Sequence, residues 1–120
     1  MKFLVVDDSA TMRKIVSLAL TGAGHSYAEA GNGREALEAI RSGKPDCILL
    51  DINMPEMNGI DFLKVRSGDS AIKSIPVIVL TTQDEEALRA EAIGLGANGF
   101  LPKPFQKEAL LDAVKTATKL

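Results

Sequence analysis

Residues 47–59 read CILLDINMPEMNG, a stretch that predicts both a fold and the place of a site. The apolar run at 47–50 lacks the alternation of a half-buried strand, so it predicts a strand buried on both faces. Asp51 follows that strand directly, and Pro55 and Gly59 predict a loop that leads into a helix. Functional groups are therefore expected at the carboxyl ends of the buried strands.

Similar apolar runs alternate with helical patterns along the chain. Strands are predicted at 3–6, 25–30, 47–50, 76–80 and 99–101. Helices are predicted at 11–20, after the turn at 31–33 and ending near Gly43, from about 59, from Asp84-Glu85-Glu86 to about 94–96, and from about 106. Five βα units with strands buried on both faces predict an α/β fold, in which a doubly wound parallel sheet is covered by helices on both sides.

Two strands are expected at the edges of this sheet. Pro102 closes the fifth strand and cannot donate a ladder hydrogen bond, which favours an edge position. The second strand, at 25–30, is the least hydrophobic and suits the opposite edge. The strand order 2-1-3-4-5 satisfies both conditions and makes the first and third strands central neighbours.

The composition fits one globular domain over residues 1–120, with 46% hydrophobic and 25% charged residues. The net charge of −2, from 14 basic and 16 acidic residues, favours neither a nucleic-acid partner nor a membrane surface. Apolar runs are far shorter than the ~20 residues that span a bilayer. The single cysteine, Cys47, cannot form an internal disulfide, so a reducing, cytoplasmic location is expected.

Polar residues stand at the ends of the predicted strands, namely Asp7, Asp8, Asp51, Thr81 and Lys103. Because the carboxyl ends of parallel strands share one edge, these side chains are expected in one crevice. Three close carboxylates repel each other, and Mg²⁺, which prefers oxygen ligands and bridges to phosphate, relieves that repulsion. Asp51 is the acid on the central strand, so it is the best candidate nucleophile for an aspartyl phosphate. Lys103 and Thr81 suit the phosphoryl oxygens.

Four motifs resemble those of the response-regulator receiver domain of two-component signalling. They are Val5-Val6-Asp7-Asp8-Ser9, LLDINMPEMNG at 49–59, Pro76-Val77-Ile78-Val79-Leu80-Thr81 and Lys103-Pro104-Phe105. The resemblance covers essentially the whole chain. It implies the flavodoxin-like (βα)5 fold with strand order 2-1-3-4-5, which agrees with the order argued from the strands themselves.

The resemblance also implies a role for each residue of the metal site. Asp51 matches the phosphoacceptor of the family. Asp8 matches a direct ligand of Mg²⁺, and Asp7 matches the acid that holds the metal through water. Asn53 occupies the position whose backbone carbonyl completes the metal site.

The remaining matches concern the phosphoryl group and the switch. Thr81 and Lys103 match the residues that bind the phosphoryl oxygens, and Phe100 stands at the aromatic switch position. On activation Thr81 is expected to move toward Asp51 and Phe100 to rotate inward. The Lys103–Pro104 bond matches a peptide bond that is usually cis in the family.

Two positions depart from the family pattern. Thr82 stands where a small Ala or Gly is usual, which predicts narrower access to the phosphoryl group. Arg66 stands where the inward face of the third helix usually carries an apolar residue. Either the helix ends there, or the aliphatic stem of Arg66 packs inside while the guanidinium reaches solvent.

The implied function is a switch that accepts a phosphoryl group from a histidine kinase, with no enzymatic activity beyond its own phosphorylation and dephosphorylation. The chain length leaves no room for an output domain, so a downstream protein is expected to dock on the fourth helix, fifth strand and fifth helix. The docking residues expected there are Arg89, Ile93, Phe100, Pro102 and Lys107. Chemotaxis of the CheY type is favoured. A phosphorelay intermediate, a kinase-feedback regulator and a fragment of a longer regulator stay open, and a phosphatase is a possible further partner.

Other classes fit the residues less well. An aspartyl-phosphate phosphohydrolase typically carries a general-acid Asp two residues after its nucleophile, where this chain has Asn53. A flavin-binding module of similar topology needs a phosphate-cradling loop after the first strand, but Asp8 puts negative charge there. The complete set of acids, Thr81 and Lys103 argues against an inactive scaffold.

Overall fold

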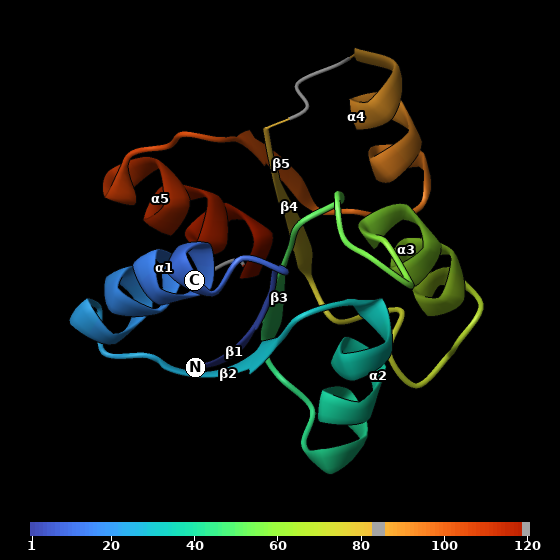
Figure 1. Cartoon of the computed structure of the whole chain (residues 1–120), viewed down its shortest axis with the longest axis horizontal. Coiled ribbons are helices and arrows are strands. Elements are labelled where there is room, and N and C mark those ends of the chain that lie inside the picture. Colours follow the sequence, from blue (N-terminus) through green and yellow to red (C-terminus); the bar gives the residue numbers. More distant parts are fainter. Residues whose placement is uncertain (83–85, 119–120) are drawn as a thin grey trace.

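The computed structural model describes residues 1–82 and 86–118, in which strands and helices alternate (Figure 1). The strands are β1 (Lys2–Val6), β2 (Ser26–Ala30), β3 (Cys47–Leu50), β4 (Val77–Thr81) and β5 (Gly99–Pro102). The helices are α1 (Ala10–Gly22), α2 (Gly33–Ser42), α3 (Gly59–Ser67), α4 (Glu86–Gly94) and α5 (Lys107–Thr118). The predicted elements are confirmed, although Asp84 and Glu85, predicted to open the fourth helix, lie outside the described residues.

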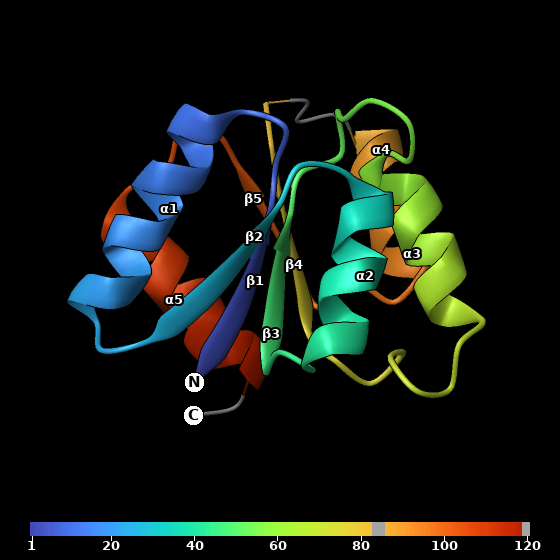
Figure 2. The ribbon, with the colours of Figure 1, turned by 60° about the horizontal axis from the view of Figure 1, so that its bottom comes forward.

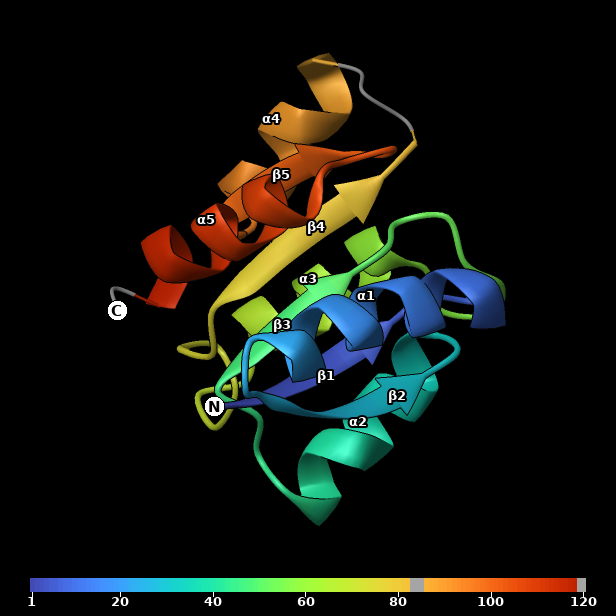
Figure 3. The ribbon, with the colours of Figure 1, turned by 90° about the vertical axis from the view of Figure 1, so that its left-hand side faces the viewer.

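The five strands form one parallel sheet in the order β2-β1-β3-β4-β5, as predicted (Figure 3). Both edge predictions are confirmed. Pro102 lies in the edge strand β5, opposite Thr81 of β4. An edge strand has a neighbouring strand on one side only, so a residue without a backbone N–H is tolerated there. At the other edge, β2 buries only Ala30. The central strand β3 is buried along its whole length.

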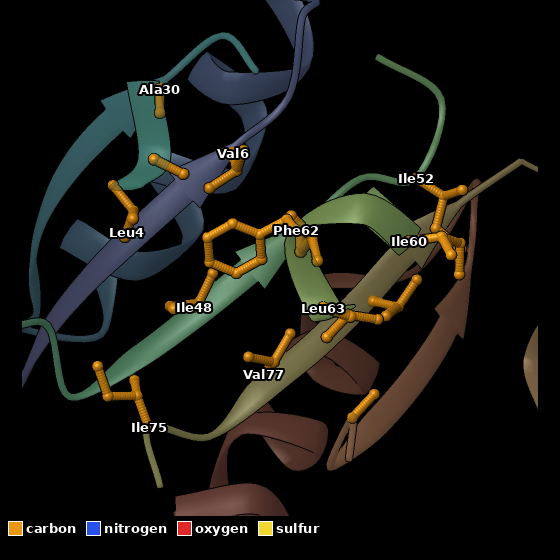
Figure 4. Packing of buried hydrophobic residues seen from close by; sticks show 14 of the residues in the cluster. Leu4, Val6, Ala30, Ile48, Ile52, Ile60, Phe62, Leu63, Ile75 and Val77 are labelled. Atoms are coloured by element: carbon orange, nitrogen blue, oxygen red, sulfur yellow. The ribbon is translucent and has the colours of Figure 1, made fainter. Parts of the chain in front are cut away.

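Helices cover both faces of the sheet (Figure 2). α1 and α5 lie on one face, over a core that includes Phe3, Leu20 and Leu110. α2, α3 and α4 lie on the other, where Phe62 and Leu63 of α3 pack in one cluster with buried residues of the sheet (Figure 4). These two cores hold the strand ends in place. Of the candidate site residues, Asp7, Asp8, Asp51 and Lys103 lie in the loops that follow those ends, and Thr81 is the last residue of β4.

The side chain of Arg66, at the end of α3, is buried together with its charged group. α3 ends one residue later, at Ser67, but the guanidinium of Arg66 does not reach solvent, because the residue is only 3% exposed. Its Nη2 and Nε donate to the carbonyl of Ile75 at 2.7 and 3.2 Å, and its Nη1 donates to the carbonyl of Gly96 at 3.3 Å. Burial lowers the pKa of Arg66. The side chain thus joins the end of α3 to two loops on the same side of the sheet.

Arg66→Ala is expected to lower the free energy of unfolding by about 2–4 kcal/mol, because it removes buried packing and leaves two backbone carbonyls without their donor. Urea denaturation followed by circular dichroism measures this loss. Lys64→Ala, at an exposed position of the same helix, is the matched control and is expected to change stability by less than ~0.5 kcal/mol. Equal stability of the two variants would contradict a structural role for the guanidinium.

Candidate phosphoryl and metal site

The predicted crevice exists at the carboxyl edge of the sheet. One carboxylate oxygen from each of Asp7, Asp8 and Asp51 lies within 4.8 Å of the other two. Nζ of Lys103 lies 2.6 Å from Oδ2 of Asp7 and 3.7 Å from Oδ1 of Asp51. Thr81, fully buried, is the last residue of the adjacent strand β4. The structure therefore brings together the acids and the lysine that sequence analysis selected, with the threonine on the neighbouring strand.

Strand register is the reason that these acids meet. β1 and β3 are neighbours, and Val6 pairs with Leu50, so the next residue of each strand is an aspartate. The backbone N–H of Asp51 donates to the carbonyl of Val6 at 2.8 Å, which continues the pairing past the strand end. On the other side, the N–H of Asp7 donates to the carbonyl of Ala30 at 3.0 Å. The backbone thus holds both carboxylates from neighbouring strands at one point.

Negative charge in the crevice is only partly balanced. Asp7 and Asp51 are 5% and 6% exposed, whereas Asp8 is exposed. Burial raises the pKa of Asp51, and the charge of Asp7 raises it further. Lys103 and hydrogen bonds from the backbone of Asn53 and Ile52 oppose this shift in the pKa of Asp51 without cancelling it. A carboxylate whose charged form is disfavoured in this way gains from an added cation.

The lysine is bound more closely to Asp7 than sequence analysis implied. The 2.6 Å contact with Asp7 is the shorter of its two ion pairs, and the Oδ1 of Asp7 also accepts the N–H of Ser9 at 2.9 Å. Asp7 therefore has two donors, and Asp51 is left with the longer ion pair. The Lys103–Pro104 peptide bond is cis, as the family resemblance implied.

The predicted aromatic switch residue and the predicted docking residues lie on α4 and β5 and at the start of α5. Phe100 is half-buried in β5, and Cζ of Arg89 on α4 lies 5.5 Å from the centre of its ring. Ile93 on the same helix is 47% exposed. Arg89 and Lys107 are exposed and Pro102 is half-buried, so the set forms a mixed apolar and basic surface. Thr82 is exposed, and its side chain is not buried over the crevice.

Sequence analysis missed contacts that support the crevice. Nη1 of Arg13 on α1 donates to the carbonyl of Asp7 at 2.6 Å, while its Nε pairs with Oε1 of Glu29 on β2 at 2.9 Å. Asn32 at the start of α2 contacts Glu56 in the loop after Asp51. A basic residue one turn into a helix is too common a pattern to identify such a role. The Asn32 contact joins residues 24 apart, so local patterns carry no signal for it.

The chemistry of the donor set fits a hard divalent cation. The crevice offers oxygen ligands from three carboxylates, two of them buried, and the nearest positive charge is already paired with Asp7. Mg²⁺ prefers one or two carboxylates together with waters and phosphate oxygens, which matches an open cluster of this kind. A sheet edge with these acids, a buried threonine and a lysine is the arrangement that the resemblance to receiver domains predicts.

Comparisons with known proteins agree with this class. The family model of the response regulator receiver domain matches residues 3–115. CheY of Thermotoga maritima is 42% identical over 120 residues, covering 98% of each chain, and CheY1 of Helicobacter pylori strain 26695 is 40% identical, covering 96% of this chain and 94% of that one. A solved structure of CheY4 from Vibrio cholerae superposes with a TM-score of 0.90 at 39% identity, covering 97% of each chain.

The chain therefore belongs to the response regulator receiver family. Among receivers it is CheY-like, since several proteins that match it over nearly its whole length are CheY chemotaxis proteins. None of the helices within residues 1–82 and 86–118 is long and apolar enough to cross a lipid bilayer.

Proposed function

We propose that this protein is a CheY-like response regulator that accepts a phosphoryl group on Asp51 from a histidine kinase and signals by binding a downstream protein. The observation that carries the proposal is the cluster of Asp7, Asp8 and Asp51, with Lys103 between two of them. Receiver membership and the CheY relatives support both the phosphodonor and a role in chemotaxis.

In this proposal, an Oδ of Asp51 attacks the phosphorus of a phosphohistidine whose other ring nitrogen carries a proton. The phosphorus–nitrogen bond breaks, its electron pair stays on the nitrogen, and neutral imidazole leaves. Asp7, Asp8, the carboxylate of Asp51 and the backbone carbonyl of Asn53 would hold Mg²⁺. The metal would supply positive charge next to the transferring group. Lys103, whose Nζ already lies 3.7 Å from Asp51, binds a phosphoryl oxygen. The metal and Lys103 would thus be positioned before the phosphoryl group is transferred. Positive charge that is positioned in advance is the main contribution that a protein makes to such transfers.

The output surface in this proposal is the face of α4, β5 and α5. Thr81 lies at the end of β4, and Phe100 lies on the adjacent strand β5, where it pairs with Val79. A hydroxyl drawn toward the phosphoryl group by a hydrogen bond changes the packing next to Phe100. The partner then selects the phosphorylated state because it binds that surface more tightly. A phosphatase that removes the phosphoryl group is a further partner in this scheme.

The chain acts as a signalling domain of residues 1–120 in this proposal, not as a conventional enzyme with its own substrate. A phosphohydrolase is disfavoured because Asn53, two residues after Asp51, carries an amide that cannot serve as the general acid. A cytoplasmic location belongs to the same proposal, since the buried free Cys47 suits a reducing compartment. A phosphorelay or kinase-feedback role uses the same chemistry and differs only in the partner.

Mg²⁺ titration followed by NMR tests the proposal at its metal site. Wild-type protein is expected to show saturable shifts at the amides of Asp8 and Asn53, and Asp8→Ala is expected to weaken binding by at least about 10-fold. Asp112→Ala removes the same charge from an exposed position in the middle of α5 and is expected to bind as wild type. Undiminished binding by Asp8→Ala would show that the metal site lies elsewhere.

A further inference from the structure

A contact outside the crevice joins the start of α2 to the loop that follows Asp51. Nδ2 of Asn32 donates to Oε2 of Glu56 at 3.0 Å, and the N–H of Gly33 donates to the carbonyl of Met57 at 2.9 Å. Asn32 is 8% exposed, and its Oδ1 accepts the N–H of Glu35 at 2.9 Å as the N-cap of α2. One buried side chain therefore caps a helix and binds the loop at the same time.

The backbone at these positions approaches more closely than most residues allow. A Cβ atom at Gly33 would lie 2.6 Å from Cγ of Met57 and 2.9 Å from its carbonyl oxygen. The second of these distances involves backbone, which cannot rotate away as a side chain does. The loop therefore lies directly against the first turn of α2, and the position of one determines the position of the other.

Glu56 adopts a backbone conformation that glutamate rarely takes. Its φ of 61° lies in the left-handed region, where a Cβ atom is crowded by the following carbonyl. Residues in such conformations persist where the surrounding structure holds them. Here the hydrogen bond from Asn32 holds the side chain of Glu56, and the bond from Gly33 holds the next residue, Met57.

The same loop contains the groups that face the phosphoacceptor. The backbone of Asn53 hydrogen-bonds to the carboxylate of Asp51, and the side chain of Asn53 is exposed. At the far end, the N–H of Gly59 donates to the carbonyl of Ile52 at 2.9 Å and closes the loop on itself. Its middle is held by α2. Contacts made three and four residues beyond Asn53 thus hold the loop that carries it.

We propose that Asn32 and Gly33 are positioning residues for the metal site, because through Glu56 and Met57 they fix the loop that offers the Asn53 carbonyl to Mg²⁺. This inference rests on the proposed function for the identity of the ligand. It adds α2, an element that contributes no group to the crevice, to the structures that determine metal affinity. Outer contacts of this kind orient metal ligands and commonly affect affinity.

Asn32→Asp tests the proposal with little change to the fold. Aspartate caps a helix as well as asparagine does, so the bond to Glu35 is kept, whereas the bond to Glu56 becomes repulsion between two carboxylates. We expect Mg²⁺ binding, followed by NMR or calorimetry, to weaken by roughly 3- to 10-fold, at or below the low end of the range for outer-shell partners. The added negative charge by itself would strengthen binding of a cation, so the sign of the change separates positioning from simple electrostatics.

The double variant Asn32→Asp/Glu56→Gln restores a donor and an acceptor with their positions exchanged and has the net charge of wild type. It is expected to return Mg²⁺ affinity to within ~2-fold of wild type, a coupling that independent sites do not show. Unchanged or tighter binding by Asn32→Asp overturns the positioning role while leaving the proposed function intact. Absence of Mg²⁺ binding by wild-type protein overturns both.

Discussion

Asp51→Asn is expected to abolish phosphorylation by a small-molecule phosphodonor in the presence of Mg²⁺. Wild-type protein should acquire an acyl phosphate that is stable in acid and labile in base, detected by mass spectrometry of the intact chain. An amide at this position lacks the nucleophilic carboxylate oxygen, and Asp7 is already bound by Lys103 and by the N–H of Ser9. Asp112→Asn, an exposed acid on α5, is expected to label as wild type does.

The same variant carries a prediction about stability and pH. Because burial and Asp7 raise the pKa of Asp51 in the folded state, its ionised form opposes folding above that raised pKa. Asp51→Asn removes this opposition and is expected to melt at a higher temperature than wild type at neutral pH. The difference should shrink as the pH falls below the raised pKa and vanish below the ordinary carboxylate pKa, where Asp51 is protonated in both states. In the phosphorylation experiment, labelling of Asp51→Asn that persists at a serine, threonine or histidine would refute the assignment of Asp51 as the phosphoacceptor.

The architecture could be predicted because its determinants are local. Uninterrupted apolar runs such as 47–50 show which strands are buried on both faces, and a single proline, Pro102, indicates an edge. Once strands 1 and 3 are neighbours, the aspartates that follow them must meet. The crevice therefore follows from strand order and register with no knowledge of side-chain packing.

The contacts that escaped prediction depend on packing between distant segments. Arg66 was placed on a helix that sequence analysis identified, but the carbonyls that bind it belong to Ile75 and Gly96. No pattern in the sequence shows that a guanidinium will find acceptors 9 and 30 residues away. Likewise, Nζ of Lys103 lies 2.6 Å from Asp7 but 3.7 Å from Asp51, and strand order alone does not determine so small a difference.

Gly59, which the sequence marks only as the end of a loop, lies against the backbone of the proposed phosphoacceptor, Asp51. It is the first residue of α3, behind the N-cap Asn58, and it lies against the loop that follows β3. A Cβ atom at this position would collide with the backbone carbonyl oxygen of Asp51 and would lie 2.7 Å from Cα of Ile52. Both are backbone atoms of the segment that carries Asp51, the proposed phosphoacceptor, so neither can move without displacing Asp51.

Gly59→Ala is therefore expected to lower the free energy of unfolding by about 3 kcal/mol, at the upper end of the usual range for overpacking. In thermal denaturation this corresponds to a fall in Tm of roughly 10 °C for a domain of this size. Gly94→Ala is the matched control, since a Cβ atom at that helical position meets nothing within 4 Å. Alanine should be neutral there or stabilise by up to ~1 kcal/mol. If Gly59→Ala were as stable as Gly94→Ala, the close approach of α3 to Asp51 would not exist in solution. A Gly59→Ala protein that folds in the cold but binds Mg²⁺ poorly would instead show that this contact also determines the geometry of the crevice.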